Sequence, residues 1–186
     1  MATVRNPFID PSKLEFKWSK KTKPIKVKPL ACILADDSVI NHVLLATLEG
    51  TETLRANAFV CWGVDNDLWL QDEAKLHNKY IPGHMDPDGW VHFDPKPEVP
   101  VLSAQVLEEL FDLGPGGGFA IKHPQWGDKR VVGGEVMYLH YGVANDYLCK
   151  GVGKNGKPDH SDIYRVMLKF WKNTYDWAPE VTEPTT

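Results

Sequence analysis

The segment from His84 to Asp94 concentrates the side chains of this sequence that are best suited to holding a metal ion. It contains His84, Asp86, Asp88 and His92, and divalent metals accept imidazole and carboxylate ligands. Their order fits neither a zinc site nor a calcium loop, whereas Asp-Pro-Asp-Gly is a common β-turn sequence. We therefore expect a hairpin turn with no metal or cofactor, and metal binding by these four residues is the less favoured alternative.

Two other patterns would suit catalysis only in a context that the sequence lacks. Cys149 could act as a nucleophile with His140 or His160, but Cys61 occurs in the same local pattern without a matching histidine. The glycines of residues 114–118 follow a predicted helix and precede a predicted strand, the reverse of a phosphate-binding loop. We predict a non-enzymatic protein without catalytic residues, whose three cysteines are free, small and buried, as in a reducing compartment.

Tryptophans and lysines are the candidates for contact with a partner. Trp buries a large area with few rotatable bonds and is favoured at interfaces. Residues 11–29 carry seven Lys against one Glu, whereas residues 30–120 carry four basic against fifteen acidic groups. An exposed strand edge protected by charge is the favoured explanation for the lysines, and docking on an acidic partner is the alternative. The predicted partner-binding residues are Trp62, Trp69, Trp90, Lys20, Lys21 and Lys23.

Composition excludes several classes of protein. The net charge of the 186 residues is −4, and we expect no nucleic-acid partner because binding phosphates needs a surplus of Lys and Arg. No apolar run approaches the roughly 20 residues of a membrane-spanning helix, so no membrane partner is expected. A hydrophobic content of 42% with 14 prolines indicates a folded domain rather than a coiled coil or a disordered chain.

A nine-residue pattern occurs twice. Residues 56–64 (ANAFVCWGV) reappear 88 positions later as residues 144–152 (ANDYLCKGV), with five positions identical. Each copy precedes a polar turn, a short helical pattern and a tyrosine with Asn two residues before it, Tyr80 in the first copy and Tyr175 in the second. We infer a tandem duplication whose two copies adopt the same small fold.

The repeat makes specific residues equivalent. Gly63 and Gly151 should occupy matching positions that a β-carbon would crowd. Tyr80 and Tyr175 should close their copies by packing back on the strands that begin near residues 59 and 147.

The residues of the first copy predict a strand, a helix, two further strands and a short helix, in that order. Residues 23–30 are typical of an edge strand, and a helix should begin at Ser38, whose hydroxyl can cap it. Residues 59–62 and 68–70 form a predicted hairpin around the turn 64–67.

The second copy predicts the same order. A strand at 96–102 should lead to a helix from Ala104 to Leu113 that is capped by Ser103. The sequence Asn155-Gly156 predicts the next tight turn. Apolar residues from Ile163 to Trp171 recur at helical spacing and predict a longer helix.

Together these elements predict an α+β fold made of two tandem strand-helix-strand-strand-helix modules packed against each other. The first module covers residues 1–83 and includes the basic N-terminal arm, and the second covers residues 84–178. Residues 179–186 form a predicted C-terminal tail without apolar periodicity.

The repeated motif resembles small tailed-bacteriophage proteins of unknown function. The shared pattern is Lys-Pro before a branched strand, followed some 30 residues later by a small residue, Phe or Tyr, a branched residue, Cys and Gly-Val. The match is closest over residues 59–80. Those proteins carry Pro-Gly-Asp-Tyr at the head of the strand, but this chain lacks the Pro-Gly at 56–59 and 144–147, and its segment from 151 to 175 is longer. The resemblance implies a phage origin and a strand-rich module, and no activity.

These observations predict a phage binding or assembly protein, with a minor structural component of the virion as the favoured role. The alternative is an early inhibitor that binds a host enzyme or defence protein through its acidic surface. The expected partners are other virion subunits or a host protein, and self-association is a further option. The expected location is the host cytoplasm during infection and then the virion.

Overall fold

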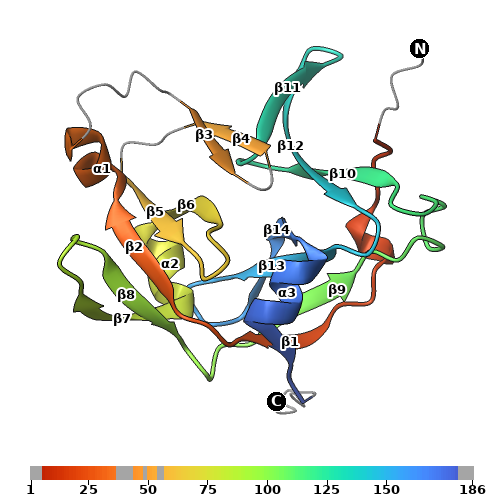
Figure 1. Cartoon of the computed structure of the whole chain (residues 1–186). Helices are drawn as coiled ribbons and strands as arrows, with labels where there is room; N and C mark the ends of the chain where they lie inside the picture. The colour runs from red at the N-terminus through yellow and green to blue at the C-terminus, as the bar shows by residue number, and fades with distance from the viewer. Residues whose placement is uncertain (1–5, 37–43, 48–49, 54–56, 180–186) are drawn as a thin grey trace.

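The chain forms a mostly β structure (Figure 1). The computed structural model describes residues 6–36, 44–47, 50–53 and 57–179. Within these ranges, thirteen strands form three antiparallel sheets, and β3 (Leu44–Thr47) pairs with β4 (Gly50–Thr53) as a separate hairpin. The α-helices have only seven residues each. The predicted α+β class is therefore wrong.

Two of the sheets have five strands. The first contains, in spatial order, β6 (Leu68–Asp72), β5 (Ala58–Trp62), β2 (Ile25–Pro29), β8 (Val91–Pro95) and β7 (Tyr80–Met85). The second contains β14 (Pro158–Val166), β13 (Tyr147–Val152), β9 (Val101–Gln105), β1 (Lys17–Lys21) and β15 (Tyr175–Trp177).

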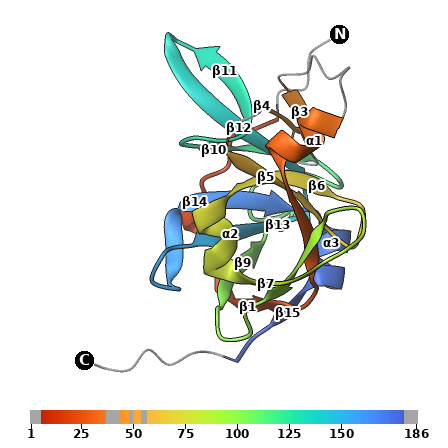
Figure 2. The ribbon, with the colours of Figure 1, turned by 90° about the vertical axis from the view of Figure 1, so that its left-hand side faces the viewer.

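The third sheet and the helices complete the fold. The sheet has the order β10 (Gly118–His123), β12 (Glu135–Val143) and β11 (Asp128–Val132), and Figure 2 shows its β11–β12 hairpin projecting from the body. A 3-10 helix, η1 (Pro11–Lys13), precedes β1. The α-helices are α1 (Leu30–Asp36) after β2, α2 (Glu73–Lys79) between β6 and β7, and α3 (Leu168–Thr174) between β14 and β15.

The two five-stranded sheets are equivalent strand by strand, with one strand exchanged. The first repeat supplies β1, β2, β5, β6, α2 and β7, and the second supplies β8, β9, β13, β14, α3 and β15 in the same order. However, β1 lies between β9 and β15 in the sheet of the second repeat, while β8 lies between β2 and β7 in the sheet of the first. Each sheet therefore contains strands from both sides of the expected module boundary at residue 84.

Strand register supports this equivalence at single residues. Tyr80 and Tyr175 each follow a seven-residue helix and pair with the exchanged strand, Tyr80 opposite Pro95 and Tyr175 opposite Lys21. Positions in β6, α2 and β7 thus correspond to positions 95 residues later in β14, α3 and β15. Lys21 and Pro95 occupy equivalent places on the two exchanged strands.

The repeated residues pack largely as predicted. Tyr80 shares a core cluster with Phe59, and Tyr175 shares one with Tyr147. Cys61 and Cys149 lie fully buried beside these tyrosines.

The cysteine prediction fails at one place. Cys32 is exposed on α1. The prediction that all three cysteines are buried is wrong for Cys32. At the start of α1, Leu30 is the residue that packs into the core.

The predicted turns are confirmed. In the first hairpin, Gly63 N–H donates to Asp67 O at 2.9 Å, and Asn66 takes a positive φ of 60°. In the second, Gly153 N–H donates to Lys157 O at 2.8 Å. The expected hairpin between β7 and β8 turns at Gly89, whose φ is 83°, a conformation that glycine adopts without steric cost.

The expected edge strand at residues 23–30 is wrong. The strand β2 lies in the middle of the first sheet, between β5 and β8. Its lysines alternate with Ile25 and Val27, which are buried. A central strand with one buried face and one charged face has the same alternating pattern as an edge strand. The sequence therefore does not distinguish the two.

The predicted helix from Ala104 to Leu113 does not form. Residues 101–105 are the central strand β9, and turns follow. Ser103 does not cap a helix, because its Oγ lies 2.7 Å from Ser19 Oγ in the buried interior and accepts a hydrogen bond from Trp171 Nε1 at 3.1 Å.

The predicted long helix from Ile163 to Trp171 is also mostly strand. Ile163 and Val166 pair with β13 as part of β14, and the helix starts only at Leu168. Sheet pairing overrides a pattern that also fits a helix. The start of the predicted helix at Ser38 and residues 180–186 of the predicted tail lie outside the described residues.

Candidate functional site

A cavity of about 160 Å³ lies among the three sheets. The first repeat lines it with residues of β1, β6, α2 and β7, and the second with residues of β14, α3 and β15. His123 of β10 and His140 of β12 complete the wall. Equivalent elements of both repeats thus face one space.

Lys21 enters this cavity from the exchanged strand β1. Its Nζ donates a hydrogen bond to the Tyr175 hydroxyl at 2.5 Å and lies 5.6 Å from the centre of the Tyr80 ring. Burial and the positive charge of Lys79 lower the pKa of Lys21 to about 7. Within the described part of the chain, no carboxylate forms an ion pair with Lys21.

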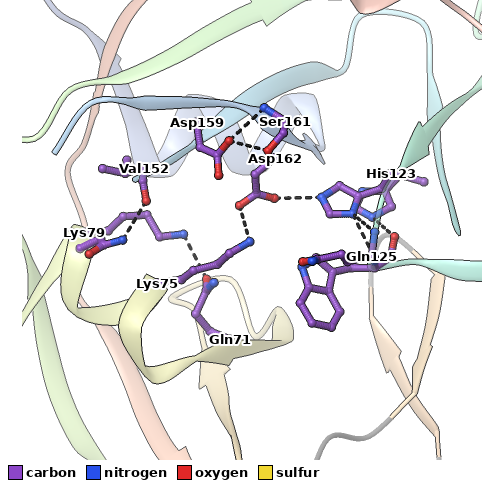
Figure 3. A network of polar contacts seen from close by, with 12 residues as sticks. Gln71, Lys75, Lys79, His123, Gln125, Val152, Asp159, Ser161 and Asp162 are labelled. Atoms are coloured by element: carbon purple, nitrogen blue, oxygen red, sulfur yellow. Dashed lines mark hydrogen bonds and ion pairs between the residues drawn. The ribbon is translucent and has the colours of Figure 1, made fainter. Parts of the chain in front are cut away.

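Two further lysines of α2 reach the same wall (Figure 3). Lys79 is buried, and its Nζ donates to Gln71 Oε1 at 3.1 Å. Lys75 Nζ lies 2.7 Å from Asp162 Oδ2. These two positions are four residues apart, so they lie on the same side of the helix.

Asp162 is the centre of a charged network that joins α2, β14 and β10 (Figure 3). Its Oδ1 lies 2.9 Å from His123 Nε2, opposite the contact to Lys75. Burial alone would raise the pKa of Asp162, but the hydrogen bonds from His123 and Lys75 outweigh it and hold the pKa well below its usual value. Asp162 is therefore an ionised carboxylate that is fixed on two sides.

The hydrogen bonds of His123 determine its tautomer. His123 Nδ1 accepts hydrogen bonds from the backbone N–H groups of Gln125 (3.1 Å) and Trp126 (2.9 Å). Because an accepting ring nitrogen carries no proton, the proton lies on Nε2 and is donated to Asp162.

His140 stacks on His123, with ring centres 5.1 Å apart. Its Nε2 donates to Trp126 O at 3.0 Å, so its Nδ1 is an acceptor, and this buried atom has no hydrogen-bond partner within the described residues. Burial, with the neighbouring His123 acting in the same direction, lowers the pKa of His140 to about 4. The neutral His140 ring therefore lines the cavity with an acceptor atom, Nδ1, that has no hydrogen-bond donor among the described residues.

Asp67 occupies the position equivalent to Asp162, 95 residues earlier, and also lines the cavity. A β-carbon on Gly63 would lie 2.0 Å from Asp67 Oδ1, and one on Gly151 would lie 2.3 Å from Asp162 Oδ2. This confirms the prediction that both glycines occupy crowded positions, and it gives the reason: each makes room for a carboxylate. The environments differ, because burial raises the pKa of Asp67.

The predicted partner-binding tryptophans do not form one surface. Trp62 and Trp90 are half-buried and pack edge to face, with ring centres 5.4 Å apart. Trp69 packs against the core of the first sheet and lines the cavity.

The predicted lysines also separate. Lys20 is exposed, whereas Lys21 points into the cavity and Lys23 is an exposed residue at its wall. The structure thus brings together Lys21, Lys23 and Trp69 of the predicted set.

The metal candidates organise the β7–β8 hairpin. Asp86 Oδ1 accepts hydrogen bonds from the N–H groups of Asp88 (3.1 Å) and Trp90 (2.9 Å), and His92 Nε2 lies 3.4 Å from Asp86 Oδ2. His84 stacks on His92, with ring centres 4.3 Å apart. Among the residues that the structure describes, no three His, Cys, Asp or Glu side chains are grouped to hold a metal ion.

Sequence reasoning missed most of the cavity wall, although one signal was present. Aligning the second halves of the repeats on Tyr80 and Tyr175 also aligns Asp67 with Asp162. A carboxylate retained in both copies would have pointed to the site. Lys75, Lys79, His123 and His140 have no such counterpart in the repeat.

Comparison with known proteins finds no matching family model, no similar curated protein and no similar solved structure. Each helix in the described part of the chain is too short or too polar to cross a membrane.

Replacing the two equivalent aspartates should have different effects on stability. We expect Asp162→Asn to lower the free energy of unfolding by about 2–4 kcal/mol, because it removes a charge that Lys75 and His123 require. Asp67→Asn removes a carboxylate that burial disfavours, and should cause no loss of stability. Urea denaturation at neutral pH measures both variants, and equal losses would contradict the different environments assigned to the two positions.

Lys21→Met should stabilise the protein in a pH-dependent manner. Between pH 7 and 10 the unfolded chain keeps a proton on Lys21 that the folded protein has lost, so wild-type stability rises with pH in this window. The advantage of Lys21→Met over the wild type should therefore shrink by roughly 2 kcal/mol between pH 7 and 9. Lys20→Met is the matched control, since Lys20 is exposed on the same strand. A difference between wild type and Lys21→Met that does not change with pH would contradict the burial of this charge.

Proposed function

We propose that this protein binds a small anionic ligand with an apolar body in the cavity among its three sheets. The observation that carries the proposal is the half-buried Lys21, whose ammonium group contacts a phenol and aromatic rings but forms no ion pair with a carboxylate among the described residues. Asp67 acts on this charge electrostatically but forms no ion pair with it, and removing an ammonium group from water without an ion-pair partner is unfavourable. A bound anion would be that partner.

The two repeats line the cavity with opposite character, which suits such a ligand. At equivalent positions, the first repeat has Gln71, Asp72, Lys75 and Lys79, and the second has Val166, Met167, Phe170 and Thr174. At these positions the first repeat is polar and carries two cations, while the second is mainly apolar, although it also lines the cavity with Asp162 and Arg165. An anionic group would lie near Lys21 and Lys79, and the apolar body would lie against Val166, Met167 and Phe170.

The size and access of the cavity set the scale of the ligand. A cavity of about 150 Å³ holds benzene in an engineered protein, and this one measures about 160 Å³. Its wall includes the exposed residues Lys23, Pro24, Val64 and Leu68, which give it contact with solvent. A carboxylate with a short branched or aromatic side chain fits these limits.

Binding of small carboxylates tests the proposal directly. We expect 4-methylpentanoate or benzoate to raise the melting temperature and to change the fluorescence of Trp69 and Trp126, which line the cavity, whereas the uncharged amides should bind at least tenfold more weakly. Lys21→Met should weaken carboxylate binding by roughly 10- to 100-fold, the value of one charge-assisted hydrogen bond. Lys20→Met should leave it unchanged. Equal binding of acids and amides, or no binding, would refute the proposal.

The role in assembly or inhibition expected from the sequence is a second candidate, and the β11–β12 hairpin favours it. This hairpin projects from the body (Figure 2) and exposes Val131 (68%), Val132 (53%) and Val136 (54%). An exposed apolar edge strand is a common site of pairing with another chain. The partner would be another virion subunit, or a host protein met in the host cytoplasm before assembly.

Mass spectrometry of purified phage particles tests this second candidate. Presence of the chain in the particle, lost on Val131→Lys and Val136→Lys, would support a virion component held through the hairpin. Early expression with absence from the particle would favour the inhibitor. The double substitution affects exposed side chains, so the fold should be retained.

A further inference from the structure

Lys21 differs from the other cavity lysines in what surrounds its nitrogen. Lys75 is paired with Asp162, Lys23 is exposed, and Lys79 donates to Gln71. The nitrogen of Lys21 instead meets the hydroxyl of Tyr175, which can accept and return a proton. The hydroxyl of Tyr175 is in turn 3.2 Å from that of Tyr164, so a short chain of hydroxyls leads away from the amine.

We infer that Lys21 is a nucleophile that forms an imine with the carbonyl carbon of a small 2-oxo acid held in the cavity. This inference rests on the proposed binding of an anionic ligand and specifies its class. The apolar side chain of the acid would lie against Val166, Met167 and Phe170, and its carboxylate would face Lys79, whose charge is near enough to act on Lys21. Because the carbonyl of a 2-oxo acid adjoins its carboxylate, neighbouring lysines can engage both groups.

The reaction needs only proton transfers. The lone pair of neutral Lys21 Nζ forms a bond to the carbonyl carbon, and the C=O electron pair moves to the oxygen, which takes a proton from the Tyr175 hydroxyl. Nζ returns a proton to Tyr175, which leaves a carbinolamine. Tyr175 then donates a proton to the carbinolamine hydroxyl, which departs as water while the nitrogen lone pair forms the C=N bond, and the N–H proton of the resulting iminium returns to Tyr175. One amine and one ketone give one imine and one water, with no oxidation or reduction.

The cavity keeps the amine available near neutral pH. With a pKa of about 7, about half of Lys21 is neutral at pH 7, whereas an exposed lysine with a pKa of about 10.4 is neutral in roughly one molecule in a few thousand. An imine-forming lysine needs this neutral form. The charged and titratable groups that act on Lys21 are Lys79 of α2, Asp67 next to β6, Cys61 of β5, Cys149 of β13, Tyr80 of β7 and Tyr175 of β15.

Reductive trapping tests the inference. The full chain is incubated at pH 7 with 4-methyl-2-oxopentanoate and cyanoborohydride, which delivers hydride to the imine and leaves a stable secondary amine. We expect one adduct per chain, located at Lys21 by peptide mapping, at least tenfold more abundant than the adduct at any exposed lysine. The rate should level off above pH 7 to 8, where Lys21 is fully neutral.

Two controls separate this inference from the proposed function. The 2-hydroxy acid of the same skeleton cannot form an imine but should still bind and raise the melting temperature. Lys21→Arg keeps a cation but has no nucleophilic amine, so it should retain binding of the hydroxy acid and lose at least nine-tenths of the trapping. Lys20→Arg should trap like the wild type.

Each result decides between the two claims. Binding of the hydroxy acid without an adduct at Lys21, or adducts spread evenly over exposed lysines, would overturn the imine and leave the anion site standing. No binding of either acid to the wild-type protein would overturn both. If Lys21→Arg does not fold, the location of the adduct in the wild-type peptide map still decides.

Discussion

The exchange of β1 and β8 between the two sheets is the constraint on which the rest of the structure depends. Because β1 pairs with β9 and β15, the first repeat delivers Lys21 opposite Tyr175 of the second. The ring of Tyr80 of the first repeat lies near the same ammonium, with its centre 5.6 Å away. A separate module could not build this arrangement, since its own first strand would lie elsewhere. The exchange also joins the two repeats through main-chain hydrogen bonds between strands that line the cavity.

Equivalent positions in the two repeats have then acquired different chemistry. Asp67 and Asp162 lie at equivalent positions, each beside an equivalent glycine, Gly63 or Gly151, but only Asp162 contacts a lysine and a histidine. Environments that push the pKa values of two carboxylates apart give them different roles. In this cavity, Asp162 fixes the position of Lys75 and of the His123 ring, whereas Asp67 retains a buried oxygen without a partner among the described residues. The duplicated framework supplies symmetry, and the side chains of the first repeat turn it into a site with a cationic side.

The sequence alone predicts features that depend on neighbouring residues or on the repeat. The turns at Asn66 and Gly156, the burial of Cys61 and Cys149, and the crowding at Gly63 and Gly151 follow from residue types and from the repeat. The apolar spacing after Ser103 fits a helix, and the contacts that place Ser103 in a strand come from distant residues, Ser19 and Trp171. Lys21 was selected for the wrong reason, as a surface charge, since nothing local shows that β1 leaves its own repeat. The pairing of distant strands could not be predicted from the sequence. This pairing determines which strands are central and where the cavity lies.

The position of Lys21 is hard to explain by stability alone. The equivalent position on the other exchanged strand holds Pro95, which faces Tyr80 without burying a charge, and Thr174 likewise stands where the first repeat has Lys79. Both cations thus belong to one repeat and converge on one space, where each makes the other less stable. A core selected only for packing would avoid this arrangement, because two neighbouring ammonium groups, one buried and one half-buried, repel each other and lose hydration. Local conflicts of this kind are expected where a protein binds or reacts. An anion that neutralises the pair would remove the repulsion, so relief of this repulsion would contribute to the affinity for the ligand.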